Sequence, residues 1–161
     1  MSVFKDILLA IKALRPTPLP TYTVDFGVVA GAAGYAAELI PSGASLLVRS
    51  VWFSKPSAAI TYRIIKASTP STGGTSTDAV AVSVNGARNA KAQTKIFTAV
   101  PTAGVAVGDV FEMAVGTGDS VDVTFGDNGT EPLEVSGNQA LVINVSAAAT
   151  IVGRIVFQER P

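Results

Sequence analysis

The sequence predicts an all-β protein folded as an antiparallel sandwich or barrel, preceded by one helix. From Thr21 onward, apolar and polar residues alternate with a period of two in a series of short runs, which is the pattern of half-buried strands. β-branched residues, which favour strands, dominate these runs. Turn signals rich in Gly, Pro, Asn and Ser separate the runs, as is typical of sandwiches and barrels.

The helix comes first in the chain. Over residues 3–14, apolar residues recur at helical spacing, so they would form one stripe along a helix. Ser2 is suited to cap the N-terminus of this helix. Arg15 precedes Pro16 and ends the helix, because a residue before proline disfavours the helical conformation. Pro16-Thr17-Pro18-Leu19-Pro20 then forms a short, stiff connector. The chain therefore divides into a helix and connector over 1–20 and a β-sandwich domain over 21–161. The stripe consists of Phe4, Ile7, Leu8, Ile11 and Leu14.

A helix of this length is marginal alone in water, so it must pack against something. It could fold back on its own domain, or the stiff connector could project it onto another protein chain. For the second interpretation we expect the anchoring contacts to be Phe4, Ile7, Leu8 and Ile11.

The strands follow the connector. They are expected at residues 22–28, 46–53, 60–65, 80–84, 111–115, 121–125, 141–145 and 151–157. The turn signals beside them are Pro41-Ser42-Gly43, Lys55-Pro56-Ser57, Ser71-Thr72-Gly73-Gly74, Asn85-Gly86, Gly116-Thr117-Gly118, Asp127-Asn128-Gly129 and Ser136-Gly137-Asn138. The runs 45–53 and 140–145 are apolar on both faces. Because sheet packing covers one face only, the other face could lie at a subunit interface.

Composition excludes several classes of chemistry. The chain has 161 residues, which suits one domain, and no His or Cys. Ser-His-Asp catalysis, thiolate nucleophiles, disulfides and structural zinc are therefore ruled out. Charged residues make up 15% of the chain, against about a quarter in average soluble proteins. The formal net charge of zero argues against phosphate-driven binding of nucleic acid.

Membrane insertion is not expected either. Residues 1–14 are a poor signal peptide, because Lys12 interrupts their apolar stretch and no small-residue cleavage site follows it. The longest uncharged apolar run, 26–37, is far shorter than the ~20 residues of a membrane span. Its glycines match no phosphate-binding motif, and such small residues would permit close backbone approach.

Charge is segregated along the chain. Residues 49–95 contain seven bases and one acid, whereas residues 96–153 contain seven acids and no base. Strand exchange between the two halves would mix these charges on one surface. Alternatively, patches of opposite sign could meet between neighbouring subunits and fix their register.

The acids offer candidate sites of two kinds. An oxygen-rich cluster could bind calcium, but its spacing does not fit an EF-hand, and Asp-Asn-Gly is an ordinary turn. A glycosidase-type pair would need two facing carboxylates, and strand periodicity points Asp119 and Asp122 to opposite faces. We therefore assign no metal, cofactor or catalytic residue. The cluster comprises Asp119, Asp122, Asp127, Asn128 and Glu131.

Residues 47–161 resemble structural proteins of tailed phages and prophages. The similar segments are 47–67, 71–95 with Thr72-Gly73-Gly74-Thr75 and Asn89-Ala90-Lys91-Ala92, Val123-Thr124-Phe125-Gly126, Pro132-Leu133-Glu134-Val135, 140–144 and 151–159. The resemblance implies a jelly-roll-like β-sandwich that often forms trimers and serves as head decoration, spike, fibre or collar piece. It implies no catalytic residues.

We therefore expect a non-enzymatic structural protein of the virion. It would form a homo-oligomer, with a trimer the expected state, anchored by its helix to a capsid or neck protein. No nucleic acid, membrane or cofactor is expected. The alternative is a carbohydrate- or receptor-binding β-sandwich of a tail or collar appendage. Stacking of sugars would need two or more of the aromatic side chains exposed together. A third class, a carboxylate-dependent hydrolase, would need a cleft joining two acids.

Overall fold

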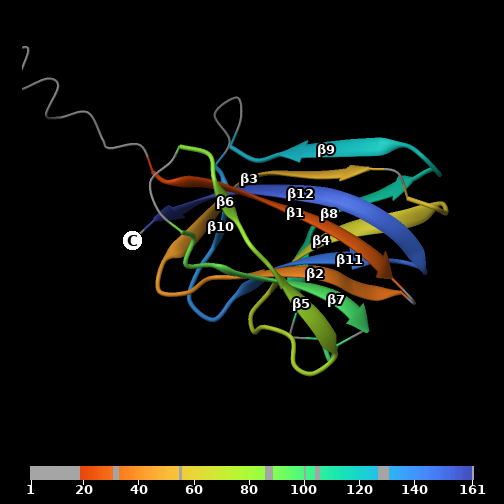
Figure 1. Cartoon of the computed structure of the whole chain (residues 1–161), viewed down its shortest axis with the longest axis horizontal. Helices are drawn as coiled ribbons and strands as arrows, with labels where there is room; N and C mark the ends of the chain where they lie inside the picture. The colour runs from red at the N-terminus through yellow and green to blue at the C-terminus, as the bar shows by residue number, and fades with distance from the viewer. Residues whose placement is uncertain are drawn as a thin grey trace, which may run out of the picture.

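A computed structural model describes residues 19–30, 33–54, 56–85, 89–99, 101–103, 106–126 and 131–160, without the side chains of 28–30 and 106–107. The predicted helix over 3–14 lies outside these residues, as do its expected contacts Phe4, Ile7, Leu8 and Ile11. The described residues contain twelve strands in two antiparallel sheets (Figure 1). No helix among them is long and apolar enough to cross a membrane.

The first sheet, sheet A, has the strand order β10-β3-β12-β1-β6, with β9 also paired to β3. Its longest pairing joins β1 to β12 along all ten residues of β1. β12 thus lies between β1 and β3, although it follows both in sequence. The strands are β1 (Thr21–Ala30), β3 (Ser45–Ser54), β6 (Val82–Ser83), β9 (Ser120–Thr124), β10 (Leu133–Val135) and β12 (Ala149–Arg160).

The second sheet, sheet B, has the order β5-β7-β2-β11-β4-β8. A register shift interrupts the pairing of β2 with β11, and two more interrupt the pairing of β4 with β8. The strands are β2 (Gly34–Ile40), β4 (Ile60–Ala67), β5 (Thr75–Ala79), β7 (Gln93–Ala99), β8 (Ala106–Val115) and β11 (Ala140–Val145).

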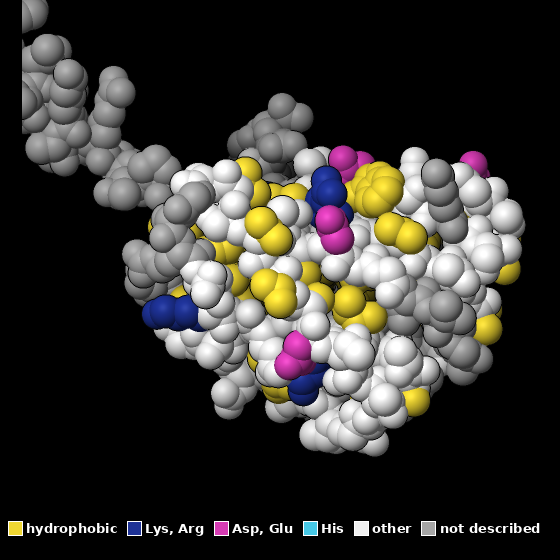
Figure 2. Space-filling view, in the orientation of Figure 1, with side chains coloured by type: hydrophobic (Ala, Val, Ile, Leu, Met, Phe, Trp, Pro, Cys, Tyr) yellow, Lys and Arg dark blue, Asp and Glu magenta, His cyan; other side chains and the backbone are white. Residues whose placement is uncertain are grey.

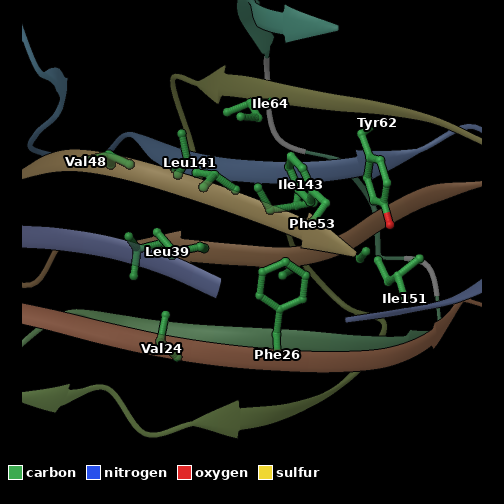
Figure 3. Close-up of a cluster of buried hydrophobic side chains, with 14 of the residues drawn as sticks. Val24, Phe26, Leu39, Val48, Phe53, Tyr62, Ile64, Leu141, Ile143 and Ile151 are labelled. Carbon is green, nitrogen blue, oxygen red and sulfur yellow. The ribbon is translucent and has the colours of Figure 1, made fainter. Parts of the chain in front are cut away.

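The core lies between the two sheets, so the predicted antiparallel sandwich is confirmed. Side chains from both inner faces fill one interior (Figure 3). The ring of Phe53 on sheet A stacks on Tyr62 of sheet B, with centroids 4.3 Å apart, and Tyr22 stacks on Phe157 at 5.5 Å. Such aromatic pairs add about 0.5–1.5 kcal/mol each beyond the burial of their area. All four rings are fully buried.

One of the sequence-based strand predictions needs correction. The run 80–84 forms only the two-residue strand β6, and its three valines are exposed instead of buried. The small-residue run 26–37 contains the end of β1 and the start of β2. The strands β2, β5, β7 and β10 were not predicted from the alternation pattern.

A second apolar cluster lies on the outer face of sheet B and is covered within the chain. Glu38 of β2 is fully buried on this face. Its two carboxylate oxygens accept hydrogen bonds from the backbone N–H (2.8 Å) and the hydroxyl (2.6 Å) of Ser71, in the segment after β4. The outer face of β11 is therefore not left for a neighbouring subunit. The cluster comprises Tyr35, Ile65, Ala67, Phe97, Ala140 and Val142.

The segment between β4 and β8, which we call the insert, carries β5, β6 and β7 to the β1–β2 side of the sandwich. A second buried carboxylate binds the part of the insert that leads into β7. Glu159 of β12 accepts hydrogen bonds from the backbone N–H groups of Lys91 (2.6 Å) and Ala92 (2.8 Å). Glu38 thus holds the start of the insert, and Glu159 holds the segment just before β7, each by accepting hydrogen bonds from backbone N–H groups.

Candidate interaction surfaces

The acids singled out in the sequence do not gather into a site within the described residues. Asp119 lies in the turn after β8, whereas Asp122 lies on β9 directly opposite Trp52. Glu134, which is not part of that cluster, accepts a 2.6 Å hydrogen bond from Arg160, and this bond lowers the pKa of its carboxyl group. Among the described residues, no three potential ligands from His, Cys, Asp and Glu lie close enough together to hold a metal ion. Asp127 and Asn128 lie outside these residues.

Part of the segregated charge is mixed within one chain. Arg63 of β4 forms ion pairs with Asp109 (2.8 Å) and Glu112 (3.0 Å) of the neighbouring strand β8. These contacts join the basic stretch of the sequence to the acidic stretch. They favour the mixed-surface interpretation on this side of sheet B.

One polar row crosses the outer face of sheet A. Register places Asp122 of β9, Trp52 of β3, Arg154 of β12 and Asp25 of β1 side by side. Arg154 donates two hydrogen bonds to Asp25, at 2.5 and 3.2 Å, and the first of these lowers the pKa of Asp25. Trp52 is 36% exposed and is the only exposed aromatic side chain among the described residues.

A hollow of about 310 Å³ opens beside the indole ring. Ser50, Trp52, Asp122 and Arg154 line it. An apolar ring bordered by hydroxyl, carboxylate and guanidinium groups can bind a small polar molecule that has one apolar face. The hollow therefore qualifies as a candidate ligand site.

A second surface is apolar. Val80, Val82 and Val84, which we call the valine stripe, are 84%, 62% and 62% exposed. They alternate with residues that face the sandwich, so all three point outward. The stripe runs beside β1, and the backbone N–H of Val84 donates a 2.8 Å hydrogen bond to the carbonyl oxygen of Thr21.

A groove of about 340 Å³ adjoins the valine stripe. It lies between the β5–β6 connection and the segment before β7, and most of its apolar lining consists of alanines. Together the stripe and groove form the edge of the sandwich that we call the insert edge. The alanines are Ala79, Ala81, Ala90 and Ala92.

The opposite edge of the sandwich is formed by β8 and β9. It exposes Val110 (37%) and Met113 (45%) together with three acids. We call it the β8–β9 edge. The acids are Asp109, Glu112 and Asp119.

Exposed apolar groups are dispersed over a surface with little charge. In the view of Figure 2, hydrophobic side chains lie among uncharged ones over β1, β2 and β12, and the few charged groups include neighbours of opposite sign. No family model, curated protein or solved structure matches this chain.

The sequence did not predict the hollow at Trp52 or the valine stripe. The expected strand at 46–53 includes Trp52 without marking it as exposed, although the alternation of β3 separates it from its buried neighbours Val51 and Phe53. The valine stripe was expected as a half-buried strand at 80–84, because an outward-facing apolar row has the same period as a buried one. The single signal against burial was the polar composition of the surrounding segment, 72–86.

Proposed function

We propose that this chain is a non-enzymatic structural subunit of a tailed-phage virion with a jelly-roll-like fold. The strand order carries the proposal. Setting aside the insert, the sheets read β9/β10-β3-β12-β1 and β2-β11-β4-β8. Successive strands β1 to β4 alternate between the sheets, and β8 to β12 return beside them in reverse order. Jelly rolls have this winding and are common in viral capsids.

The proposed subunit assembles as a homo-oligomer, with a trimer the expected state. Two surfaces support this part of the proposal: the valine stripe and the apolar side chains of the β8–β9 edge. Burial of such surface against neighbours is favourable by about 25 cal/mol per Å². The segment 3–14 then serves as the anchor to a capsid or neck protein, through Phe4, Ile7, Leu8 and Ile11.

A measurement of mass and location tests the proposal. Light scattering on the purified chain is expected to give a trimer mass, and labelled antibodies in electron microscopy are expected to decorate purified particles. A monomer that is absent from particles would overturn the proposal.

The alternative function, carbohydrate or receptor binding, would place its ligand in the hollow at Trp52, where Arg154 and Asp122 are hydrogen-bonding groups beside the ring. It has less support, because the described residues expose one aromatic ring and a sugar-stacking platform needs at least two. A glycan array would test this function on the intact chain. A binding signal that disappears in Trp52→Ala but persists in Val152→Ala, an exposed residue on the same face, would support it. Absence of any signal would contradict it.

A further inference from the structure

We propose that the hollow beside Trp52 binds a guanidinium group, the charged end of an arginine side chain on a partner protein. Four residues of sheet A line this hollow: Ser50, Trp52, Asp122 and Arg154. Its volume of about 310 Å³ has room for the planar group and part of the chain that carries it. The inference goes beyond the proposed structural role and does not depend on it, because it rests on this face of the sandwich alone.

The carboxylate of Asp122 is free to bind such a ligand. Asp122 is exposed on β9, directly opposite Trp52 of β3. Its side chain has no hydrogen bond or ion pair with any residue that the structure describes. A carboxylate accepts two parallel hydrogen bonds from a guanidinium, which makes this pairing strong and selective for its geometry.

The polar row beside the hollow carries a net negative charge, although Arg154 belongs to it. Arg154 donates one hydrogen bond to each carboxylate oxygen of Asp25, at 2.5 and 3.2 Å, so its charge is balanced within the row. The row holds two acids, Asp25 and Asp122, against this one base, which leaves a net charge of −1. An anion would therefore meet an unpaired carboxylate, and a cation is favoured.

The other bases on the strands of sheet A are bound elsewhere. Arg160 donates a 2.6 Å hydrogen bond to Glu134. Arg49 donates two hydrogen bonds to the side-chain oxygen of Gln158, at 2.8 and 3.1 Å. Neither arginine lines the hollow or forms an ion pair with Asp122. The chain therefore does not itself supply the cation that Asp122 lacks within the described residues.

One exposed ring is sufficient for a cation. The face of an indole ring attracts a cation that lies within about 6 Å of the ring centre, and tryptophan does so more strongly than tyrosine or phenylalanine. A guanidinium also stacks flat on a ring, whereas an ammonium is a compact point charge. A sugar-stacking platform needs at least two rings, and Trp52 is the only exposed one in the described parts of the chain. The hollow thus suits an arginine better than a sugar.

The surroundings of the hollow favour a protein as the source of the guanidinium. Val152 is 46% exposed on the same face and lies opposite Gly27, where a Cβ atom would meet nothing within 4 Å. A protein surface can cover this open apolar area while its arginine occupies the hollow. A small free cation would leave Val152 exposed to water. Tryptophan and arginine are also the residue types that most often dominate binding at protein interfaces.

Trp52 is the only tryptophan of the chain, so its fluorescence reports directly on the hollow. The intact chain is titrated with N-acetylargininamide, and N-acetylcitrullinamide, which has a similar shape without the charge, is the matched probe. We expect the arginine probe to saturate with a dissociation constant of about 10 mM or tighter, and the citrulline probe to bind about tenfold less tightly or worse. Asp122→Asn should weaken binding of the arginine probe about tenfold. Asp78→Asn, which removes an exposed acid of β5 in the other sheet, is the matched control and should leave binding unchanged.

A second variant tests the charge balance. Asp25→Asn should also weaken binding, because Arg154 would lose its counter-charge beside the hollow. Unchanged binding in Asp25→Asn or in Asp122→Asn would overturn the inference.

The remaining outcomes are also decisive. Equal binding of the arginine and citrulline probes, or no saturation by the arginine probe, would overturn the recognition of a guanidinium. Binding of a methyl glycoside in place of the arginine probe would overturn it in favour of the carbohydrate alternative. Tighter binding of free arginine than of the capped probe would identify a small-molecule site and overturn the assignment to a partner protein.

Discussion

The ring of Phe26 on β1 lies directly over Gly153, its cross-strand partner on β12. A Cβ atom at position 153 would come within 2.8 Å of three ring carbons of Phe26. Phe26 is 2% exposed, so the ring cannot move out into solvent without losing its burial. The aromatic ring thus fills the space that the glycine leaves empty at the centre of sheet A.

Gly153→Ala is therefore expected to lower the free energy of unfolding by about 1–3 kcal/mol, because the added methyl displaces a buried ring. Chemical denaturation followed by tryptophan fluorescence measures the loss. Gly27→Ala is the matched control: it lies on a neighbouring strand, and its new Cβ would meet no atom within 4 Å. Equal effects at the two positions would contradict the ring-over-glycine explanation.

The buried hydroxyl of Tyr62 is a second test. It has no hydrogen-bond partner among the described residues, and burial raises its pKa to about 12. Tyr62→Phe removes the desolvated hydroxyl, so we expect the free energy of unfolding at pH 7 to rise by about 1 kcal/mol. A fall in the free energy of unfolding would instead indicate that the hydroxyl has a hydrogen-bond partner.

Tyr62 also makes stability depend on alkaline pH. The unfolded chain ionises near pH 10 and the folded chain near pH 12, so the unfolded state loses the tyrosine proton first as the pH rises. The free energy of unfolding is therefore expected to fall as the pH rises from 10 toward 12. The decline should be less steep in Tyr62→Phe, as measured by denaturation at several pH values.

Glu38→Ala is expected to destabilise the protein by about 1–3 kcal/mol, because the backbone N–H of Ser71 would lose its acceptor. Glu38→Gln keeps one acceptor oxygen and should lose less. Hydrogen exchange should rise in the segment 68–74 in both variants. Unchanged exchange there would show that the segment is held by other contacts. Ser71→Ala, which keeps the N–H, is the control.

The exposed pair of Asp25 and Arg154 should contribute little to stability. Solvent screens such pairs, and both side chains are more than half exposed. The lowered pKa of Asp25 means that its contribution is present above the usual pKa of 3.8 and is lost as the pH falls below it. Asp25→Asn should leave the denaturation midpoint at pH 7 within experimental error. A loss of stability as large as that of Gly153→Ala would show that this ion pair contributes more than expected.

Deleting residues 1–20 is expected to leave a folded, oligomeric sandwich that no longer enters particles. Light scattering measures the mass, and analysis of purified particles measures incorporation. Combined Ser substitutions at Phe4, Ile7, Leu8 and Ile11 should act like the deletion. Ala substitutions at Lys5 and Lys12, outside the apolar stripe, are the control. Normal incorporation of the deleted chain would contradict the anchoring role.

The fold was largely predictable because strand alternation and turn residues act locally. Gly43, Gly118 and Gly137 have positive φ values at turns that the sequence had indicated. The missed strand β2 has a fully buried acid, Glu38, which disrupts the alternation, and its partner Ser71 is distant in sequence.

The candidate surfaces were less predictable, for a physical reason. Periodicity places residues on one of two faces but does not say which face meets the other sheet. Trp52 and Val80 occupy outward positions in runs that also fit a core. Only the pairing of distant strands, such as β3 with both β9 and β12, determines the side on which each lies.

The central place of β12 in sheet A has a consequence for how the chain acquires its structure. Because β1 and β3 are bridged only by a strand that follows every other described strand, sheet A cannot close during synthesis until that strand is available. Folding must then wait on contacts between segments more than a hundred residues apart, such as Asp25 with Arg154. Chains with such distant contacts fold slowly. During that interval the edges of β1 and β3 are unpaired and open to association with other nascent chains.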